Sequence, residues 1–265
     1  MTGYKHLKFE SNDGVALITL NRPDISNALN IPLGEELNRC LDTLKDDESI
    51  RAVVITGTEK SFSSGGDLKG MKTAIDEEKP KEFMMQLLQP IYEIVIKIRN
   101  LPKPVIAVVN GYAIGAGMNL SLACDLIIAS EKAVFSEAFI DVALIPGMGG
   151  TFLLPRLVTR TKAAELFFTG RRVTAKEAKE LGIVNEVVAP ENLESFAWDF
   201  AINLARKPTK AIARTKALMN RTFMHSMEEH LKLEREMQVL TSGDQDFAEG
   251  VNAFWEKRKP KFQGK

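Results

Sequence analysis

The sequence contains few cysteines, no excess of charge of either sign and no long apolar run. Its 265 residues include two cysteines, Cys40 and Cys124, so it offers neither a disulfide framework nor a paired-cysteine metal or redox site. Lysine plus arginine and aspartate plus glutamate number 35 each, so no net field attracts nucleic acid or an anionic membrane. No apolar run approaches the roughly 18 residues of a membrane helix, and no basic-then-apolar signal peptide opens the chain. We therefore expect a cytoplasmic protein without nucleic-acid or membrane partners.

Histidine is also scarce. The three histidines, His6, His225 and His230, do not have the spacing of metal ligands, so we predict no metal site. Hydrophobic residues, by contrast, make up 45% of the chain, which is enough to bury a full-sized core.

Strand-like runs of β-branched and apolar residues alternate with helical patterns over the first two thirds of the chain. Leu33, Leu37, Leu41 and Leu44 recur at helical spacing between two such runs, which predicts a strand-helix-strand unit. Alternating strands and helices are typical of an α/β layered fold. The predicted strands cover residues 15–20, 52–56, 105–109, 125–129, 134–136 and 183–188.

The strand signal ends near Pro190, and the rest of the chain has helical patterns. We therefore divide the chain into a core domain, residues 1–190, and a helical C-terminal region, residues 191–265. A short helix over residues 174–181 is also expected, because Thr174 and Glu177 form a capping-box pattern. The C-terminal helices are predicted at residues 193–205, 210–221, 227–241 and 247–256.

A glycine-rich segment, residues 110–117, directly follows the apolar strand of residues 105–109. Residues without bulky side chains let the backbone pass close to a ligand, and they leave N–H groups free to point at it. Such a segment is suited to an oxyanion site, in which fixed N–H donors stabilise a developing negative charge by roughly 3 to 4 kcal/mol per donor.

Four segments and one early turn, in this order and spacing, closely resemble the enoyl-CoA hydratase/isomerase (crotonase) superfamily from about Leu7 onwards. They are Ser61 to Leu68, Asn110 to Gly117, Phe135 to Leu157, Ala253 to Pro260, and the turn Asn21-Arg22-Pro23. The resemblance implies a spiral of ββα units with an α-helical C-terminal region that serves oligomerisation and site completion. It also implies an acyl-CoA substrate, no cofactor besides the coenzyme A of the substrate, a homotrimer or homohexamer, and a thioester oxygen held by the N–H groups of Gly66 and Ala116.

The catalytic carboxylates of the family are missing from the matching positions. The two glutamates of family hydratases would fall at Asn119 and Phe139, and neither residue can accept a proton near neutral pH, although Asn119 can orient a water or an acyl group. The segments after Phe135 look most like the isomerases of ring-opened phenylacetate and the related chlorobenzoyl-CoA dehalogenases. Those relatives carry an aspartate directly after the position of Pro146, where this chain has Gly147.

Three nearby groups are candidates for the missing proton carrier. Glu137 lies two residues before Phe139 and shares its face on an extended segment, although a structural role is the simpler interpretation. Asp141 is the second candidate, with a surface or helix-capping position as its alternative. Tyr92 is the third, with core packing as its alternative. We predict Glu137 and Tyr92 as catalytic, together with Asn119.

The resemblance also indicates the substrate-binding residues. They are Ser26, Ala28, Ser64, Asp67 and Leu68 for coenzyme A, and Phe139, Asp141 and Gly147 near the acyl group. Arg22 and Lys69 are local candidates for the phosphates. Met71, Phe83, Met84 and Met85 suggest a pliable apolar wall for an acyl chain, with plain packing as the alternative.

The leading prediction is an acyl-CoA enzyme that stabilises a thioester enolate, either an enoyl-CoA isomerase or a hydratase-like lyase. Two alternatives remain open at this point. One is a CoA-thioester-binding protein without catalytic activity, which the missing carboxylates favour. The other is an acyl-CoA decarboxylase or thioesterase, for which an oxyanion site with an asparagine or tyrosine suffices.

Overall fold

A computed structural model describes residues 3–265, so the first two residues of the predicted core domain lie outside the described residues. The fold is α/β and contains a six-stranded sheet of order β1-β2-β3-β5-β7-β10 and a four-stranded sheet of order β4-β6-β8-β9. The strands are β1 (Leu7–Asn12), β2 (Val15–Leu20), β3 (Ala52–Gly57), β4 (Ser61–Ser63), β5 (Val105–Val109), β6 (Tyr112–Ile114), β7 (Leu126–Ser130), β8 (Val134–Ser136), β9 (Val173–Thr174) and β10 (Glu186–Val188). The α-helices are α1 (Ile31–Asp46), α2 (Leu68–Asp76), α3 (Pro80–Asn100), α4 (Ala116–Ala123), α5 (Gly150–Leu157), α6 (Arg160–Thr169), α7 (Ala175–Glu180), α8 (Leu193–Ala205), α9 (Thr209–Met219), α10 (Met227–Ser242) and α11 (Gln245–Trp255). Three single-turn 3₁₀ helices are η1 (Pro23–Ile25), η2 (Ile140–Val142) and η3 (Pro190–Asn192).

From β3 to β8, consecutive strands alternate between the two sheets. The pairs β3 and β4, β5 and β6, and β7 and β8 each give one strand to the six-stranded sheet and the next to the four-stranded sheet. Helices follow each pair, and the matching strands of successive turns are parallel. This arrangement is a spiral of ββα units, so the predicted fold is confirmed.

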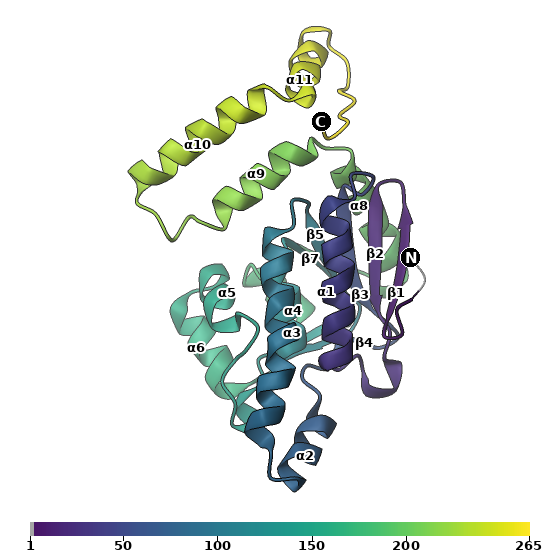
Figure 1. Ribbon diagram of the computed structural model, residues 1–265, viewed down its shortest axis with the longest axis vertical. Coiled ribbons are helices and arrows are strands. Elements are labelled where there is room, and N and C mark those ends of the chain that lie inside the picture. Colours follow the sequence, from purple (N-terminus) through teal and green to yellow (C-terminus); the bar gives the residue numbers. More distant parts are fainter. Residues whose placement is uncertain (1–2) are drawn as a thin grey trace.

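The six-stranded sheet is covered on both faces, as is usual for parallel strands. Helices α1 and α3 pack together over one face (Figure 1). The four leucines of the predicted helix are buried there. Helix α8 covers the other face through Ala197, Ala201 and Ala205, which contact strand residues such as Val54 and Ile106. Small side chains at every fourth position let this helix lie close to the sheet.

The four-stranded sheet holds α4 in close contact with β4. A Cβ atom on Gly117 would lie 2.3 Å from the Ser63 carbonyl oxygen, and one on Gly111 would lie 1.9 Å from the Lys60 carbonyl oxygen. Two glycines of the 110–117 segment therefore serve the approach of backbone to backbone rather than to a ligand.

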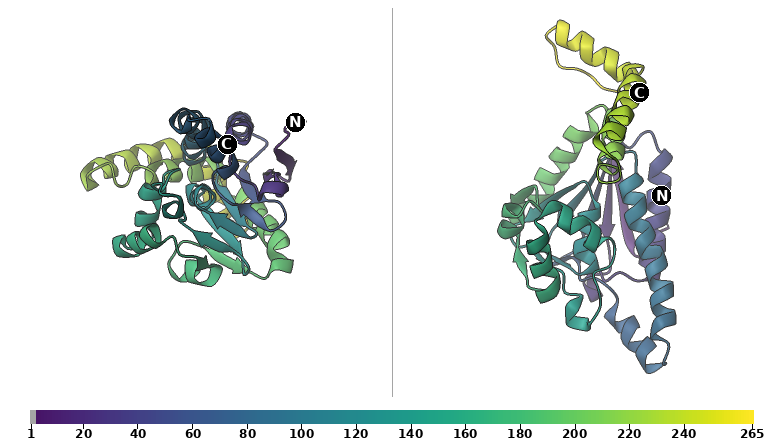
Figure 2. Two further views of the ribbon diagram at one scale, coloured as in Figure 1. Left: turned by 90° about the horizontal axis from the view of Figure 1, so that it is seen from below. Right: turned by 90° about the vertical axis from the view of Figure 1, so that its left-hand side faces the viewer.

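The C-terminal region is helical, and only its first helix packs onto the sheet. Helices α9 to α11 extend beyond the end of the sheet as a separate lobe (Figures 1 and 2). An ion pair between the buried Lys216 and the half-buried Asp125 joins this lobe to the core, since Lys216 Nζ lies 2.7 Å from Asp125 Oδ2. Asn220 adds a second link by donating a hydrogen bond of 2.7 Å to the Arg99 carbonyl oxygen.

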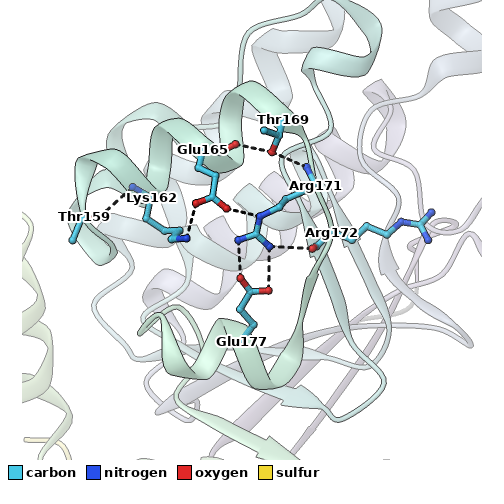
Figure 3. A network of polar contacts seen from close by, with 7 residues as sticks. All are labelled: Thr159, Lys162, Glu165, Thr169, Arg171, Arg172 and Glu177. Atoms are coloured by element: carbon cyan, nitrogen blue, oxygen red, sulfur yellow. Dashed lines mark hydrogen bonds and ion pairs between the residues drawn. The ribbon is translucent and has the colours of Figure 1, made fainter.

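Helices α6 and α7 are tied together by a network of charged side chains around Arg171 (Figure 3). Arg171 contacts Glu165 through Nε at 2.6 Å and Glu177 through two nitrogens at 2.7 and 3.1 Å. Lys162 extends the network to Glu165. These hydrogen bonds hold the pKa values of Glu165 and Glu177 below their ordinary range.

The predicted strands and C-terminal helices are present, but the helices α2, α4, α5 and α6 and several short or polar strands were not predicted. The strands β4, β6 and β9 have two or three residues each, and β1 is a mostly exposed edge strand, so their sequences lack a strong apolar pattern. The strand predicted at residues 183–188 is limited to β10. Within residues 3–265, no helix is both long and apolar enough to cross a membrane.

Candidate active site

A cavity of about 260 Å³ lies where several segments meet around the N-terminus of α4. The β4–α2 segment, α3, the β6–α4 segment and the segment between β8 and α5 all contribute to its walls. Its lining is almost wholly apolar apart from backbone groups, the Ser64 hydroxyl and the Tyr92 hydroxyl. The lining residues are Ser64, Gly65, Gly66, Leu68, Met71, Met84, Leu87, Leu88, Ile91, Tyr92, Ile114, Gly115, Ala116, Ala138, Phe139, Val142, Leu144, Ile145, Gly147 and Met148.

Gly66 and Ala116, the predicted oxyanion residues, both line this cavity. Ala116 is the first residue of α4, and Gly66 lies two residues before α2. Among residues 3–265, neither N–H group donates a hydrogen bond to another backbone group. Because first-turn N–H groups have no partner within their helix and lie at its positive end, the Ala116 N–H suits an oxygen that gains negative charge.

Glycines at positions 65 and 115 let the two segments that carry these N–H groups lie close together. Gly65 has φ +96°, and a Cβ atom on it would lie 2.7 Å from the Ile114 carbonyl oxygen and 3.4 Å from the Ala116 nitrogen. Gly115 has φ +51° and precedes the helix directly. Since L side chains rarely adopt such angles, the close approach of these segments depends on glycine.

Tyr92, Phe139 and Gly147 meet at one wall of the cavity. A Cβ atom on Gly147 would lie 3.0 Å from the Tyr92 hydroxyl oxygen and 3.7 Å from Phe139 Cε1. The Tyr92 hydroxyl therefore fills the space toward which a side chain at position 147 would point. The tyrosine side chain is 42% exposed, so it is not a buried core residue.

Glu137 and Asn119 lie behind the wall and are not lining residues. They are 1% and 0% exposed, respectively, and Asn119 Nδ2 donates a hydrogen bond of 3.3 Å to Glu137 Oε2. Burial raises the pKa of Glu137 to about 8, although the hydrogen bond from Asn119 acts in the opposite direction. A carboxyl group in this state is mostly neutral at pH 7.

The residues predicted to bind coenzyme A divide into two groups. Ser64 and Leu68 line the cavity, and the Ser64 N–H donates a hydrogen bond of 2.9 Å to the Ser26 carbonyl oxygen. Ser26 is exposed beside the cavity residues, whereas Ala28 is buried and presents little surface.

Asp67 has a structural role at the start of α2. Its Oδ1 accepts a hydrogen bond of 3.0 Å from the Gly70 N–H, and its carboxylate lies 4.0 Å from Arg22. Asp141 is exposed on η2 and is not a lining residue. The structure thus brings neither aspartate into the cavity wall.

Several lining residues were not predicted from the sequence. Leu87, Leu88 and Ile91 of α3 line the cavity with Met84 and Tyr92, while Phe83 and Met85 do not. The lining residues of α3 are spaced so that they share one face of the helix. The same spacing is found in a helix face that is buried in the core, so it does not indicate a cavity. Only the position of α3 in the fold shows that this face also borders a cavity.

The fold and this cavity can be compared with those of known proteins, and the comparison identifies the family. The profile of the family described as Enoyl-CoA hydratase/isomerase matches residues 10–265, and the chain belongs to this family. It is an acyl-CoA thioester enzyme of the crotonase superfamily, as predicted, and its reaction type is left open by the comparisons.

The relatives include both isomerases and hydratases. The chain is 37% identical over 262 residues to the trans-2-decenoyl-[acyl-carrier-protein] isomerase of Streptococcus mutans, and the aligned residues cover 99% of each chain. It is 38% identical over 253 residues to the 1,2-epoxyphenylacetyl-CoA isomerase of Escherichia coli, covering 95% of this chain and 96% of the relative. A crystal structure of a protein described as a putative enoyl-CoA hydratase from Streptomyces coelicolor superposes with a TM-score of 0.94 at 34% identity, covering 100% of this chain and 96% of that one.

Proposed function

We propose that this protein binds the thioester oxygen of an acyl-CoA between the N–H groups of Gly66 and Ala116 and isomerises an enoyl-CoA through its enolate. The observation that carries the proposal is that Gly66 and Ala116 both line one apolar cavity and that, among residues 3–265, neither N–H group donates to another backbone group. Fixed donors aimed at an oxygen that gains charge in the transition state commonly lower the barrier by about 3 to 4 kcal/mol each.

Isomerisation fits the cavity better than hydration does. Hydration needs a group that activates water, and the sequence has Asn119 and Phe139 where family hydratases carry glutamates. Asn119 is fully buried and directs its amide to Glu137 and to the Gly147 carbonyl oxygen, at 3.3 and 2.9 Å. Isomerisation needs one group that removes a proton from one carbon and returns it to another.

We assign the proton transfer to Tyr92. Among the described residues that line the cavity, Tyr92 alone has a titratable side chain. Its hydroxyl lies beside Gly147 and Phe139, on the wall that borders the acyl group in this proposal. The apolar side chains of α2 and α3 suit an aliphatic acyl chain, and Ser26, Ser64 and Leu68 lie at the end assigned to coenzyme A.

The proposal is tested with a ten-carbon enoyl-CoA and its non-reactive thioether analogue. We expect the thioester to bind more tightly, because only its carbonyl oxygen accepts the two hydrogen bonds. Equal affinities would contradict the oxyanion site. Turnover is followed by the NMR signals of the shifted double bond, and Tyr92→Phe is expected to lose about 10² to 10⁴ in kcat. Tyr112→Phe is the matched control, since Tyr112 is 44% exposed and lies outside the cavity.

Decarboxylation is a second candidate function that one observation favours. Loss of carbon dioxide from a carboxylated acyl-CoA produces the enolate without a base, and the cavity lining contains no carboxylate among residues 3–265. Release of carbon dioxide from malonyl-type thioesters, without isomerisation, would support it. Tight binding with no turnover of either substrate type would instead support a non-catalytic acyl-CoA-binding protein.

We also propose a cytoplasmic homotrimer or homohexamer that uses no cofactor beyond the coenzyme A of its substrate. The support for assembly is the exposed apolar surface of the C-terminal lobe, which a protein of this kind buries against another copy. Light scattering coupled to size exclusion tests it, and a monomer would contradict it. The exposed apolar residues include Met219, Phe223, Met227, Leu231, Val239, Leu240, Phe247, Phe254 and Trp255.

A further inference from the structure

Two buried oxygen atoms beside the cavity have no hydrogen-bond partner among the described residues. They are Asn119 Oδ1 and Glu137 Oε1. A buried carboxyl group is costly in an apolar surrounding, and the proton transfer assigned to Tyr92 does not use it. The position of Glu137 therefore needs an explanation of its own.

Asn119 links α4 to two points of the segment between β8 and α5. Its Nδ2 donates to Glu137 Oε2 at 3.3 Å and to the Gly147 carbonyl oxygen at 2.9 Å. Asn119 belongs to α4, Glu137 follows β8, and Gly147 lies in the segment before α5. One amide group thus joins both ends of this segment to the helix that begins with Ala116.

Residues 136 and 137 also hold the first turn of α4, residues 115–119, in place. The Gly115 N–H donates to the Ser136 carbonyl oxygen at 2.7 Å, directly before Ala116. The Asn119 N–H donates to the Gly115 carbonyl oxygen at 3.1 Å. Residues 136 and 137 therefore hold this turn at two points, through the Ser136 backbone and the Glu137 side chain.

The turn of residues 147–150 is folded around the Asn119 amide. The Gly150 N–H donates to the Gly147 carbonyl oxygen at 2.9 Å, the same oxygen that accepts from Asn119 Nδ2. A Cβ atom on Gly150 would lie 2.3 Å from that Nδ2 atom, so the asparagine fills the space that any larger residue at position 150 would need. Movement of Asn119 would consequently displace the wall that faces the Tyr92 hydroxyl.

We propose that Glu137 is a positioning residue, which orients the Asn119 amide and thereby fixes the spacing between the Ala116 N–H and the Gly147 wall. The catalytic consequence rests on the proposed function, whereas the structural link does not. The pKa of about 8 agrees with this role, because a neutral carboxyl group has a hydrogen to donate and Asn119 Oδ1 is an acceptor without a partner in the same cluster. In this role Glu137 does not touch the substrate.

Two substitutions of Glu137 separate positioning from proton transfer. Glu137→Met keeps the length of the side chain but removes the acceptor, whereas Glu137→Gln keeps both an acceptor and hydrogens to donate. Asn119→Ala breaks the same link from its other end. Amide hydrogen exchange of the free protein measures how well the segments 115–119 and 147–150 are protected. The values of kcat and KM are measured with the ten-carbon enoyl-CoA, and the affinity is measured with its thioether analogue.

We expect Glu137→Met and Asn119→Ala to raise exchange in both segments about tenfold and to lower kcat about tenfold. The affinity for the thioether analogue should change less than threefold, and Glu137→Gln should recover most of the protection and turnover. Wild-type exchange in Glu137→Met and Asn119→Ala would overturn the proposal. Loss of turnover in Glu137→Gln with full protection would also overturn it, because Glu137 would then be a proton carrier. If the wild-type protein turns over no thioester, the proposed function fails while the exchange measurement still decides the positioning role.

Discussion

The raised pKa of Glu137 predicts that stability falls as the pH rises. In the folded protein the pKa is raised from 4.5 to about 8, so the carboxyl keeps its proton in the folded state at pH values where the unfolded chain releases it. The stabilisation is fully present below pH 4.5 and is lost as the pH rises toward 8. At about 1.4 kcal/mol per pH unit, the whole effect amounts to about 5 kcal/mol.

The Glu137→Gln variant isolates this contribution, because glutamine does not titrate and has nearly the same shape. We expect the free energy of unfolding of the wild-type protein to fall, relative to the variant, by about 1.4 kcal/mol per pH unit between roughly pH 5.5 and 7.5. Urea unfolding followed by circular dichroism at one protein concentration measures it. Glu131→Gln, in an exposed turn of the same region, is the matched control and should follow the wild-type protein.

A difference between wild type and Glu137→Gln that stays constant within about 0.5 kcal/mol over this range would refute the reasoning. Such a result would mean that the folded protein solvates the Glu137 carboxylate, through local opening or bound water. A difference of the opposite sign would mean that Glu137 is stabilised as the anion by a cation that the described contacts do not include.

Further predictions concern the oxyanion site, the reaction and the C-terminal lobe. Ala116→Pro removes one N–H at the first position of α4, where proline is tolerated, and should lower kcat/KM about 10²- to 10³-fold with little change in circular dichroism. Hydration of crotonyl-CoA should be weak or absent in a spectrophotometric assay, because Asn119 and Phe139 replace the carboxylates of family hydratases; turnover near the ~10³ per second of fast enzymes would contradict this. Lys216→Met leaves the half-buried Asp125 without its partner, and denaturant unfolding should show a loss of about 1 to 3 kcal/mol. Adding Asp125→Asn should recover part of that loss, and an unchanged midpoint in the single variant would contradict the prediction.

Local patterns and motif order in the sequence were enough to predict the family and most of the architecture. The predicted helix at residues 193–205 matches α8, and the predicted strand at residues 105–109 matches β5. These elements are long or strongly apolar, so their periodicity is clear without knowledge of their neighbours. The strands β4 and β6 were not predicted, because strands of three residues carry too little pattern.

The sequence by itself determined the residue types at the candidate site: Gly66 and Ala116 as the proposed N–H donors, and no carboxylate at positions 119, 139 and 147. It left Glu137, Tyr92 and Asp141 as candidates for the proton carrier and preferred the first two, since all three are ionisable and lie near the motifs. Only the tertiary structure separated them, by placing the Tyr92 hydroxyl against Gly147 in the cavity and Glu137 behind the wall against Asn119. The physical reason is that burial and hydrogen bonding are set by segments distant in sequence. Asn119 and Gly147, for example, are 28 residues apart and meet only because the chain winds once around the spiral.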